Sequence, residues 1–552
     1  MTILSTERVS SNAVIIPVIV TILCLVPFVN KAFHIDDPLF IWAAKHIQSD
    51  PLDFYGFAVD WGITEKQISD VTKNPPLACY YIALVGLLFG FSEVALHLAF
   101  LVPAVAVALG TYYLARQFCS QAVPATLAMV LTPAFLVSGT NVMCDIMMLA
   151  MWVWAILLWV RGIQTDKKLS LFFAAVLISM CALTKYFGMS LLGLLFFYSL
   201  MQKRKLGIWV LFFLIPIVVL AGYQWVTYSL YGRGLLSDAA AFATEQRWAG
   251  SEYFMKGLIG LAFTGGCVIT GLFYTPLLWS RRVLVVGVIL AVVLVFALTF
   301  EEKIGPVCTR DVGGIRWGLL TQIALMSVAG AGLLVLAAED FYRCRDSKSL
   351  LLLLWVLGTF VFASLVNWVI NARSILPIAP AAGILLMRRI DRSCKTDRHR
   401  GGFWSVSWPL VPAAIIAMLV CRADYILAGT ARDAAGIIQK KFENRNLKIW
   451  FGGHWGFQYY MEAAGGVALD FKRSGPALED GDVIVYPLNN TGIEPLSQSK
   501  VRPSETLQVG RRRWLATMDP WLGAGFYADA WGPLPFVIGP VKPEEYYFYI
   551  VN

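Results

Sequence analysis

The sequence predicts an α-helical polytopic membrane protein with about thirteen transmembrane helices and a small C-terminal extracytoplasmic α/β domain. Of the 552 residues, 58% are hydrophobic and only 15% are charged, which is too little charge to cover soluble domains of this length. Apolar runs long enough to cross about 30 Å of hydrocarbon recur from residue 13 to residue 421. The composition then changes, because 28 of the last 131 residues are charged, against 53 of the first 421.

Thirteen apolar runs are interpreted as membrane spans, in order along the chain. The first follows Arg8, as a signal peptide would, but no small-x-small cleavage pattern comes soon after it, so we interpret it as an anchor. The thirteenth leads directly into the polar tail. The runs cover residues 13–31, 94–115, 122–138, 146–160, 170–184, 187–201, 206–230, 257–279, 283–300, 318–338, 350–370, 375–389 and 405–421.

A further apolar stretch, 76–91, is left out of this count because of the distribution of charge. With thirteen spans and the N-terminus inside, the cationic clusters lie on short cytoplasmic loops, as the positive-inside rule requires. A fourteenth span here would move them outside. We therefore expect 76–91 to form an interfacial or re-entrant helix in the first outer loop, 32–93; the alternative, that it spans and a weaker run does not, stays open. The inner cations are Arg116, Arg161, Lys167, Lys168, Lys203, Arg204, Lys205, Arg281, Arg282, Arg343, Arg345, Lys348 and the six in 388–400.

Two composition features exclude other classes of protein. The formal charge of +9 comes from the cytoplasmic loops, so it gives no support for a nucleic-acid partner. The ten cysteines are scattered singly, without a C-x-x-C pair, so neither a zinc site nor a disulfide framework is predicted.

The predicted domain boundary lies between residues 421 and 422. Residues 1–421 form the transmembrane module, and 422–552 form a soluble domain that follows the thirteenth span and so lies outside. Within this tail the pattern predicts a helix over 424–442, a strand over 447–451, a helix over 455–464, and strands over 467–469 and 483–486. Such an alternation is typical of an α/β domain.

Ionisable residues at a membrane boundary are costly to place and often functional. Directly after the first span, the sequence F-H-I-D-D-P places His34, Asp36 and Asp37 at the outer surface, at the start of an amphipathic helix. Two carboxylates there could serve as a general base or as ligands of a cation. They could equally cap the helix, a reading that Pro38 in its first turn supports.

Further isolated charges fall on outer loops. Asp145 precedes the fourth span, Lys185 lies in a short hairpin between two spans, and Arg310, Arg316 and Arg373 lie in later outer loops. Each has an ordinary alternative: a solvated carboxylate, a snorkelling lysine, or an arginine at lipid headgroups. Carboxylates and isolated cations on one face are nevertheless the pattern expected where a phosphate-bearing group is handled at the lipid boundary.

These residues occur in an order that resembles a known family. From about residue 13 to residue 390, the chain resembles the polyprenyl-phosphate-dependent glycosyltransferases of the GT-C fold, in particular the family-39 protein mannosyltransferases and the aminoarabinose transferase of lipid A. That family has an acidic pair after the first span, a proline motif opening a non-spanning helix, an outer Asp, a motif T-K-G-F or similar, in which Tyr186 here replaces the usual Gly, and a late Arg-x-x-x-Pro. The matching residues are Asp36 and Asp37; Asn74, Pro75, Pro76, Tyr80, Tyr81, Phe89 and Gly90; Asp145; Thr184, Lys185 and Tyr186; and Arg373 and Pro377.

The resemblance implies an integral membrane hexosyl- or pentosyltransferase. Its donor would be a sugar on a polyprenyl monophosphate, its acceptor a protein, lipid or glycan, and its place the extracytoplasmic face of a bacterial cytoplasmic (inner) membrane. By this resemblance Asp36 is the general base and Asp37 orients the acceptor or binds a cation, although the two roles could be reversed. Asp145 is a supporting carboxylate. Lys185 and Arg373 bind phosphate, and Tyr81, Arg310 and Arg316 are further substrate-binding candidates.

Cofactor use and the class of activity leave alternatives. No cofactor is required, but a divalent metal held by His34, Asp36 and Asp37 stays open, since two or three donors from one loop make an incomplete shell. The alternative activity is a lipid-linked sugar transporter or flippase without transferase chemistry. Transporters typically show repeated halves and ionisable residues near the midplane. Neither pattern is apparent in the sequence, which therefore favours a transferase.

Overall fold

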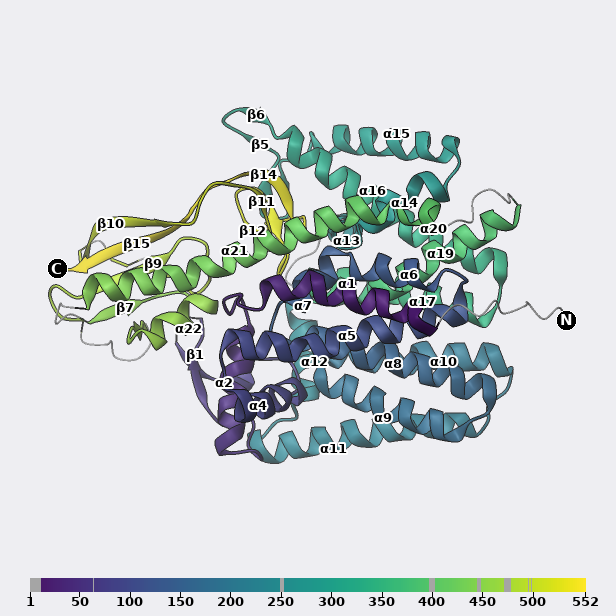
Figure 1. The fold of residues 1–552 in the computed structure, drawn as a ribbon. Coiled ribbons are helices and arrows are strands. Elements are labelled where there is room, and N and C mark those ends of the chain that lie inside the picture. The colour runs from purple at the N-terminus through teal and green to yellow at the C-terminus, as the bar shows by residue number, and fades with distance from the viewer. Residues whose placement is uncertain are drawn as a thin grey trace.

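In the computed structural model, the helices form a bundle and the C-terminal strands lie at one of its ends (Figure 1). The structure describes residues 11–62, 64–248, 253–396, 403–443, 448–470, 478–494, 496–497 and 499–552, so part of the cationic loop 388–400 lies outside the described residues. We call the end with the C-terminal strands the sheet end. The opposite end carries the C-termini of α16 (Trp317–Cys344) and α19 (Ile378–Thr396).

The chain is a polytopic α-helical membrane protein, and most of its helices run along the bundle. The other bundle helices are α1 (Ile15–Leu25), α5 (Glu93–Phe118), α6 (Ala122–Val130), α7 (Pro133–Gly139), α8 (Cys144–Thr165), α9 (Lys168–Thr184), α10 (Ser190–Lys203), α11 (Leu214–Tyr231), α13 (Tyr253–Cys267), α14 (Thr270–Leu278), α15 (Arg281–Leu298), α17 (Ser347–Val361) and α21 (Leu410–Phe442). Shorter or peripheral helices are α2 (Asp37–Ser49), α3 (Ile68–Val71), α4 (Leu77–Phe89), α12 (Leu235–Trp248), α18 (Ala372–Ile375), α20 (Phe403–Ser407) and α22 (Trp455–Ala463).

The count of thirteen spans is not confirmed. Among the described residues, seven helical segments are long and apolar enough to cross a membrane, or nine if two bent pairs each count as one span. The bent pairs are α6 with α7, at 64°, and α13 with α14, at 84°. Pro133 opens α7 and interrupts the first pair. The runs 13–31 and 170–184 form shorter helices, because an apolar run fixes composition and not the length of unbroken helix.

The stretch 76–91 forms the single short helix α4. Its 13 residues extend about 20 Å, which is too short to cross about 30 Å of hydrocarbon. The helix packs along α2 and leaves Leu87 and Phe89 exposed. It ends at Gly90, whose φ of 79° is accessible to glycine without steric cost. These features fit the predicted non-spanning helix of the first outer loop.

The C-terminal region is continuous with the bundle. Helix α21 runs unbroken for 33 residues through the predicted boundary at 421/422 and into the sheet end (Figure 1). Beside it lies a five-stranded mixed sheet of order β10-β15-β9-β7-β8, in which β7 pairs in parallel with β8 and β9 and the other pairs are antiparallel. Apolar side chains of α21, such as Ile438, pack on the sheet. The strands are β7 (Ile449–Phe451), β8 (Val467–Ala468), β9 (Val483–Pro487), β10 (Val501–Val509) and β15 (Glu544–Val551).

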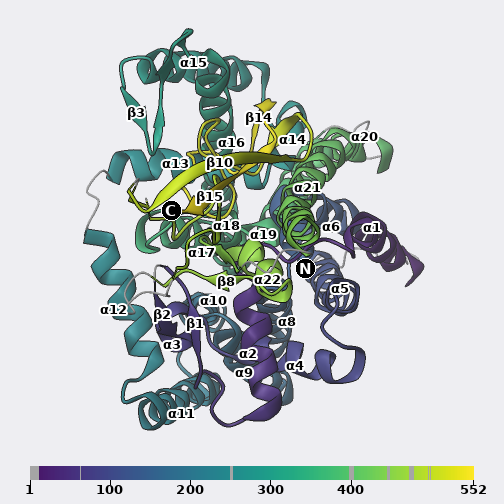
Figure 2. The ribbon, with the colours of Figure 1, turned by 90° about the vertical axis from the view of Figure 1, so that its left-hand side faces the viewer.

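Smaller strand pairs complete the sheet end. The chain between β10 and β15 returns to the bundle through β11 (Arg513–Ala516), β12 (Met518–Asp519), β13 (Ala524–Gly525) and β14 (Val537–Val541), with β11 pairing β14 and β12 pairing β13. Figure 2 shows this part from the sheet end. The loops between helices hold three more two-stranded pairs: β1 (Ala58–Asp60) with β2 (Glu65–Gln67), β3 (Lys303–Ile304) with β4 (Val307–Cys308), and β5 (Arg310–Asp311) with β6 (Gly314–Ile315).

Candidate functional site

Four of the predicted residues meet at the sheet end, although they come from four separate segments of the chain. Asp36 precedes α2, Asp145 lies in the first turn of α8, Lys185 ends α9, and Arg373 lies in α18. A carboxylate oxygen of Asp36 is 2.9 Å from Nη2 of Arg373. A carboxylate oxygen of Asp145 is 2.6 Å from Nζ of Lys185. The Arg373 charge interacts with both carboxylates, so the two ion pairs are neighbours.

The adjacent carboxylates Asp36 and Asp37 lie in different surroundings. Asp37 is fully buried; one of its oxygens accepts from the backbone N–H of His34 at 2.9 Å and the other from that of Val142 at 2.8 Å. Its side chain therefore ties the first outer loop to the loop before α8. Burial outweighs the Lys31 charge and these hydrogen bonds, and raises the pKa of Asp37 to about 7. The Asp36 side chain is 27% exposed and can be reached by a substrate.

The guanidinium of Arg373 is held from several sides. Besides its pair with Asp36, it lies 2.9 Å from the sulfur of Met143 through Nη1 and stacks 5.6 Å from the ring centroid of Tyr527. Its Nε is buried and makes no hydrogen bond within the described part of the chain. Burial disfavours the charged form, but Asp36 and Asp145 outweigh it and raise the pKa of Arg373.

A buried polar network, absent from the sequence predictions, lies behind these pairs. Lys31 and Asp424 are fully buried and form an ion pair of 2.6 Å, and Lys31 also donates to the amide oxygen of Asn141 at 2.5 Å. Asp424 accepts from the hydroxyl groups of Thr517 at 3.0 Å and Tyr527 at 2.8 Å. The network thus joins the chain between α1 and α2, the loop before α8, helix α21 and the C-terminal segment.

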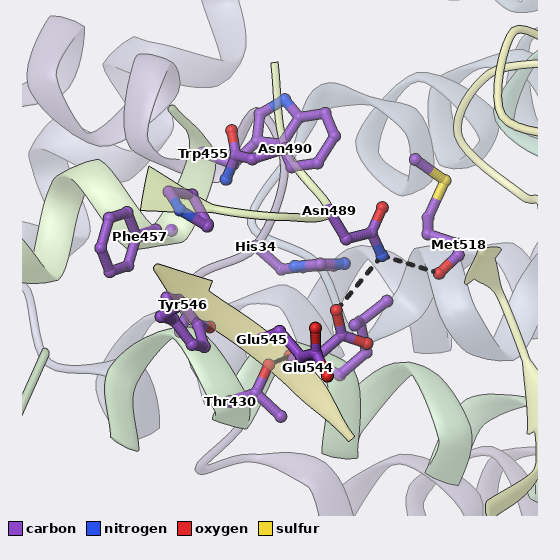
Figure 3. Close-up of a pocket in the computed structure, with 14 residues that line it drawn as sticks. His34, Thr430, Trp455, Phe457, Asn489, Asn490, Met518, Glu544, Glu545 and Tyr546 are labelled. Atoms are coloured by element: carbon purple, nitrogen blue, oxygen red, sulfur yellow. Dashed lines mark hydrogen bonds between the residues drawn. The ribbon is translucent and has the colours of Figure 1, made fainter. Parts of the chain in front are cut away.

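The ring of His34 faces this network and the C-terminal region. It packs edge-on against Tyr527, with 5.4 Å between ring centroids, and its Nε2 is 3.9 Å from a carboxylate oxygen of Asp424. Burial lowers the pKa of His34 to about 4 despite the Asp424 charge, so the ring is neutral at pH 7. Figure 3 shows His34 beside a pocket lined by C-terminal residues, among them Asn489 and Glu544.

The residues predicted as metal ligands point to different partners. Asp36 pairs with Arg373, both oxygens of Asp37 accept backbone N–H groups, and His34 packs on Tyr527. Within the described ranges, no three His, Cys, Asp or Glu side chains are placed to share a metal ion. This arrangement does not fit a metal held by His34, Asp36 and Asp37.

Three further candidates make contacts elsewhere. The hydroxyl group of Tyr81 donates to the carbonyl of Ala99 at 2.8 Å, which joins α4 to α5. Arg310 donates to the carbonyl of Thr299 at 3.2 Å. Arg316 donates to the carbonyl of Trp521 at 2.6 Å. These contacts hold outer loops and the C-terminal region in place.

A comparison with protein families finds one match. Residues 73–225 match the model of the dolichyl-phosphate-mannose-protein mannosyltransferases, in agreement with the resemblance seen in the motifs. The matched segment includes Asp145 and Lys185 and leaves Asp36 and Arg373 outside. No curated protein sequence matches the chain.

The chain is also similar in arrangement to several solved structures. Archaeal oligosaccharyltransferase AglB from Archaeoglobus fulgidus, in complex with an inhibitory peptide and a dolichol-phosphate, is 13% identical with a TM-score of 0.49, over 86% of this chain and 69% of that one. ArnT from Cupriavidus metallidurans, bound to undecaprenyl phosphate, is 14% identical with a TM-score of 0.41, over 87% and 94%. Mycobacterial arabinofuranosyltransferase AftD is 12% identical with a TM-score of 0.39, over 99% of this chain and 40% of that one.

Proposed function

We propose that the chain is an integral membrane glycosyltransferase that moves a hexose or pentose from a polyprenyl-monophosphate donor to an acceptor hydroxyl group. The observation that carries this proposal is the match of residues 73–225 to a family of polyprenyl-type mannosyltransferases, because it includes Asp145 and Lys185 of the paired charges at the sheet end. A donor with an isoprenoid tail stays in the bilayer, so a many-spanned protein with its site at one end of the bundle suits this chemistry.

Lys185 and Arg373 are the proposed phosphate ligands. The ammonium of Lys185 has three donors, of which the contact with Asp145 uses one, and its side chain is 19% exposed. Arg373 offers a planar fork beside it. In this structure each of the two cations is paired with a carboxylate. A phosphate bound beside Lys185 and Arg373 places its negative charge next to both positive centres. That charge increases at the leaving oxygen as the glycosidic bond breaks, which is where fixed cations are most effective.

Asp36 is the proposed general base. The acceptor oxygen attacks the anomeric carbon of the donor, the bond from that carbon to the phosphate oxygen breaks, and polyprenyl phosphate leaves with the bonding pair. The acceptor proton passes to Asp36, which is the reachable member of the acidic pair. Asp37 holds the loop through backbone groups, and Asp145 orients Lys185.

We place this site at the extracytoplasmic face of a bacterial cytoplasmic membrane. The support is the excess of Lys and Arg on loops at the opposite end, as in the 203–205 and 343–348 clusters, which the positive-inside rule assigns to the cytoplasm. The sheet end, with the C-terminal region, then lies outside. The acceptor, whether a protein, a lipid or a glycan, approaches from that side.

The test is release of polyprenyl phosphate by the purified full-length protein in lipid nanodiscs. A panel of undecaprenyl- and dolichyl-monophosphate sugars is supplied with a crude extracytoplasmic acceptor extract, and wild type is compared with Asp36→Asn. If the wild type releases polyprenyl phosphate and Asp36→Asn does not, the result supports the proposal, and the sugar from which release occurs identifies the donor. No release from any donor, together with movement of a lipid-linked sugar across the bilayer, would replace it with transport.

A further inference from the structure

The C-terminal segment from Thr517 to Asp529 makes direct contacts with the segments that carry the candidate site. Two backbone hydrogen bonds fasten it to the start of α18 and the residues just before it: Ala372 N–H donates to the carbonyl of Phe526 at 2.8 Å, and Asp529 N–H donates to that of Ile370 at 2.9 Å. The Asp529 carboxylate also accepts from the N–H of Ile370 at 3.1 Å. These bonds lie within three residues of Arg373 on its N-terminal side.

Tyr527 is the residue of this segment that reaches the site. Its ring lies 5.6 Å from the Arg373 guanidinium and touches the ring of His34 edge-on. Its hydroxyl group donates to Asp424 at 2.8 Å and accepts from the side-chain amide of Asn141 at 3.0 Å. The residue is 3% exposed, so ring and hydroxyl are both fixed by their neighbours.

These contacts give the two parts of the side chain different tasks. The Arg373 guanidinium lies over the face of the ring, 5.6 Å from its centroid, and also pairs with Asp36 at 2.9 Å. A cation over an aromatic face in a desolvated place is attracted to it and loses freedom to turn away. The hydroxyl group holds the ring at its place through the fully buried Asp424, which is itself fixed by Lys31.

From these contacts we infer that Tyr527 is a positioning residue of the transferase and that the C-terminal segment 517–529 is a working part of its active site. The ring fixes the Arg373 fork so that it meets Asp36 and the donor phosphate in one orientation. This inference rests on the proposed function for its kinetic consequence, and on the structure alone for the Tyr527–Arg373 contact.

The test compares four full-length proteins in nanodiscs: wild type, Tyr527→Leu, Tyr527→Phe and Tyr547→Leu. Tyr547 supplies the control, since it is a partly buried C-terminal tyrosine whose hydroxyl group donates to Glu545 at 2.9 Å and whose strand, β15, contains no member of the two ion pairs. Two quantities are measured: the donor KM from polyprenyl phosphate release, and the rate at which phenylglyoxal modifies Arg373, followed by mass spectrometry of its peptide. The second measurement needs no turnover.

We expect Tyr527→Leu to raise the donor KM about tenfold, as loss of a desolvated cation–π contact would, and to speed Arg373 modification about fivefold. Tyr527→Phe keeps the ring but loses the hydrogen bonds to Asp424 and Asn141, so we expect both changes to be smaller than in Tyr527→Leu. Tyr547→Leu should stay within about twofold of wild type. If Tyr527→Leu does not accumulate, Tyr527→Gln takes its place, because its amide can still hydrogen-bond Asp424 without supplying a ring.

Each outcome separates the inference from the function on which it rests. A ring-less variant with wild-type KM and wild-type Arg373 reactivity would overturn the inference while leaving the transferase intact. A lower kcat with unchanged KM and reactivity would also overturn it, since that is the mark of general loss of folded enzyme. Faster Arg373 modification in proteins that release no polyprenyl phosphate, wild type included, supports the positioning contact and rejects the proposed function.

Discussion

The two ends of the helical bundle both bury charge, but they do so differently. At the sheet end, Asp36 pairs with Arg373 while its side chain stays 27% exposed. At the opposite end, Arg388 of α19 binds both carboxylate oxygens of Asp340 in α16, through Nη2 at 3.1 Å and through Nε at 3.2 Å. Arg392 also contacts this carboxylate. Asp340 is almost completely buried. Burial of an ion pair therefore does not by itself indicate a functional site. A functional site also needs a charged side chain that is partly exposed, so that a substrate can reach it.

The role of the opposite end follows from what its charges connect. Arg388 also donates to the carbonyl of Phe118 at 3.3 Å, so one side chain joins the ends of α5, α16 and α19. A bidentate guanidinium suits such a cross-link because it fixes both distance and orientation. The sheet-end pairs instead lie on loops and helix starts, where a substrate can enter.

The largest effect should come from removing the reachable carboxylate. Asp36→Asn keeps the size of the side chain and abolishes the base, so we expect polyprenyl phosphate release to fall by about 100-fold or more. The thermal midpoint of the protein in nanodiscs should stay close to that of wild type, because Asp36 is part-exposed. If the variant retained turnover, Asp36 would not be the general base. The proposed functional difference between the two ends of the bundle would then have no support.

The reverse result is expected at the opposite end. Asp340→Asn leaves two arginines without their carboxylate in a buried place, which should lower the free energy of unfolding by about 3 kcal/mol. Turnover per folded molecule should match wild type. The measurement is unfolding in mixed micelles, with release activity normalised to the folded fraction. A variant of full stability and impaired turnover would show that this cluster acts in the reaction.

The pH dependence of the free energy of unfolding should distinguish Asp37 from Asp36. Its pKa is about 7 in the folded protein against 3.8 for the free side chain, so between these values the folded state holds a proton that the unfolded state releases. The contribution of Asp37 to the free energy of unfolding is therefore fully present below pH 3.8, and it is lost as the pH rises through about 7. From pH 5.5 to 7.5 we expect a loss of about 2 kcal/mol.

The comparison variants for this effect are Asp37→Asn and Asp36→Asn, each measured by thermal unfolding at both pH values. Asp37→Asn cannot titrate, so its difference between the two pH values should shrink. Asp36→Asn leaves the hydrogen bonds of Asp37 in place and removes only the smallest of the contributions that raise its pKa, so most of the wild-type difference should remain. Equal slopes in all three proteins would assign the dependence to other groups.

The four paired charges of the candidate site could be singled out in the sequence because each follows an apolar run. Asp36, Asp145, Lys185 and Arg373 are isolated charges beside spans, and alternation of spans brings such residues to one face of the membrane. The presence of helices over most of these apolar runs could also be predicted from the sequence. The number of spans was not, because runs such as 13–31 and 170–184 form helices that are too short, and Pro133 breaks the run 122–138 into a bent pair.

The parts that were missed depend on contacts between distant segments. Lys31 reads as an ordinary flanking lysine, and only its burial against Asp424, 393 residues away, reveals its role. Asp424 carried a usable signal, a carboxylate three residues after the apolar run 405–421, but the predicted boundary at 421/422 assigned it to a soluble domain. Tyr527 carried none. Strand β10, with its mostly exposed and polar sequence, lacks the alternation that marks a strand.

The smallest expected effect tests whether the sheet end needs a fork or only a charge. Arg373→Lys keeps the positive charge but loses the planar group that reaches Asp36, Met143 and the Tyr527 face together. We expect the donor KM to rise about tenfold with a thermal midpoint near that of wild type. Lys185→Arg is the matched reverse exchange, and because Lys185 makes its contact as a point charge we expect a smaller change. Equal effects of the two exchanges would show that the site recognises phosphate by charge alone, and the ring of Tyr527 would then have no fork to orient.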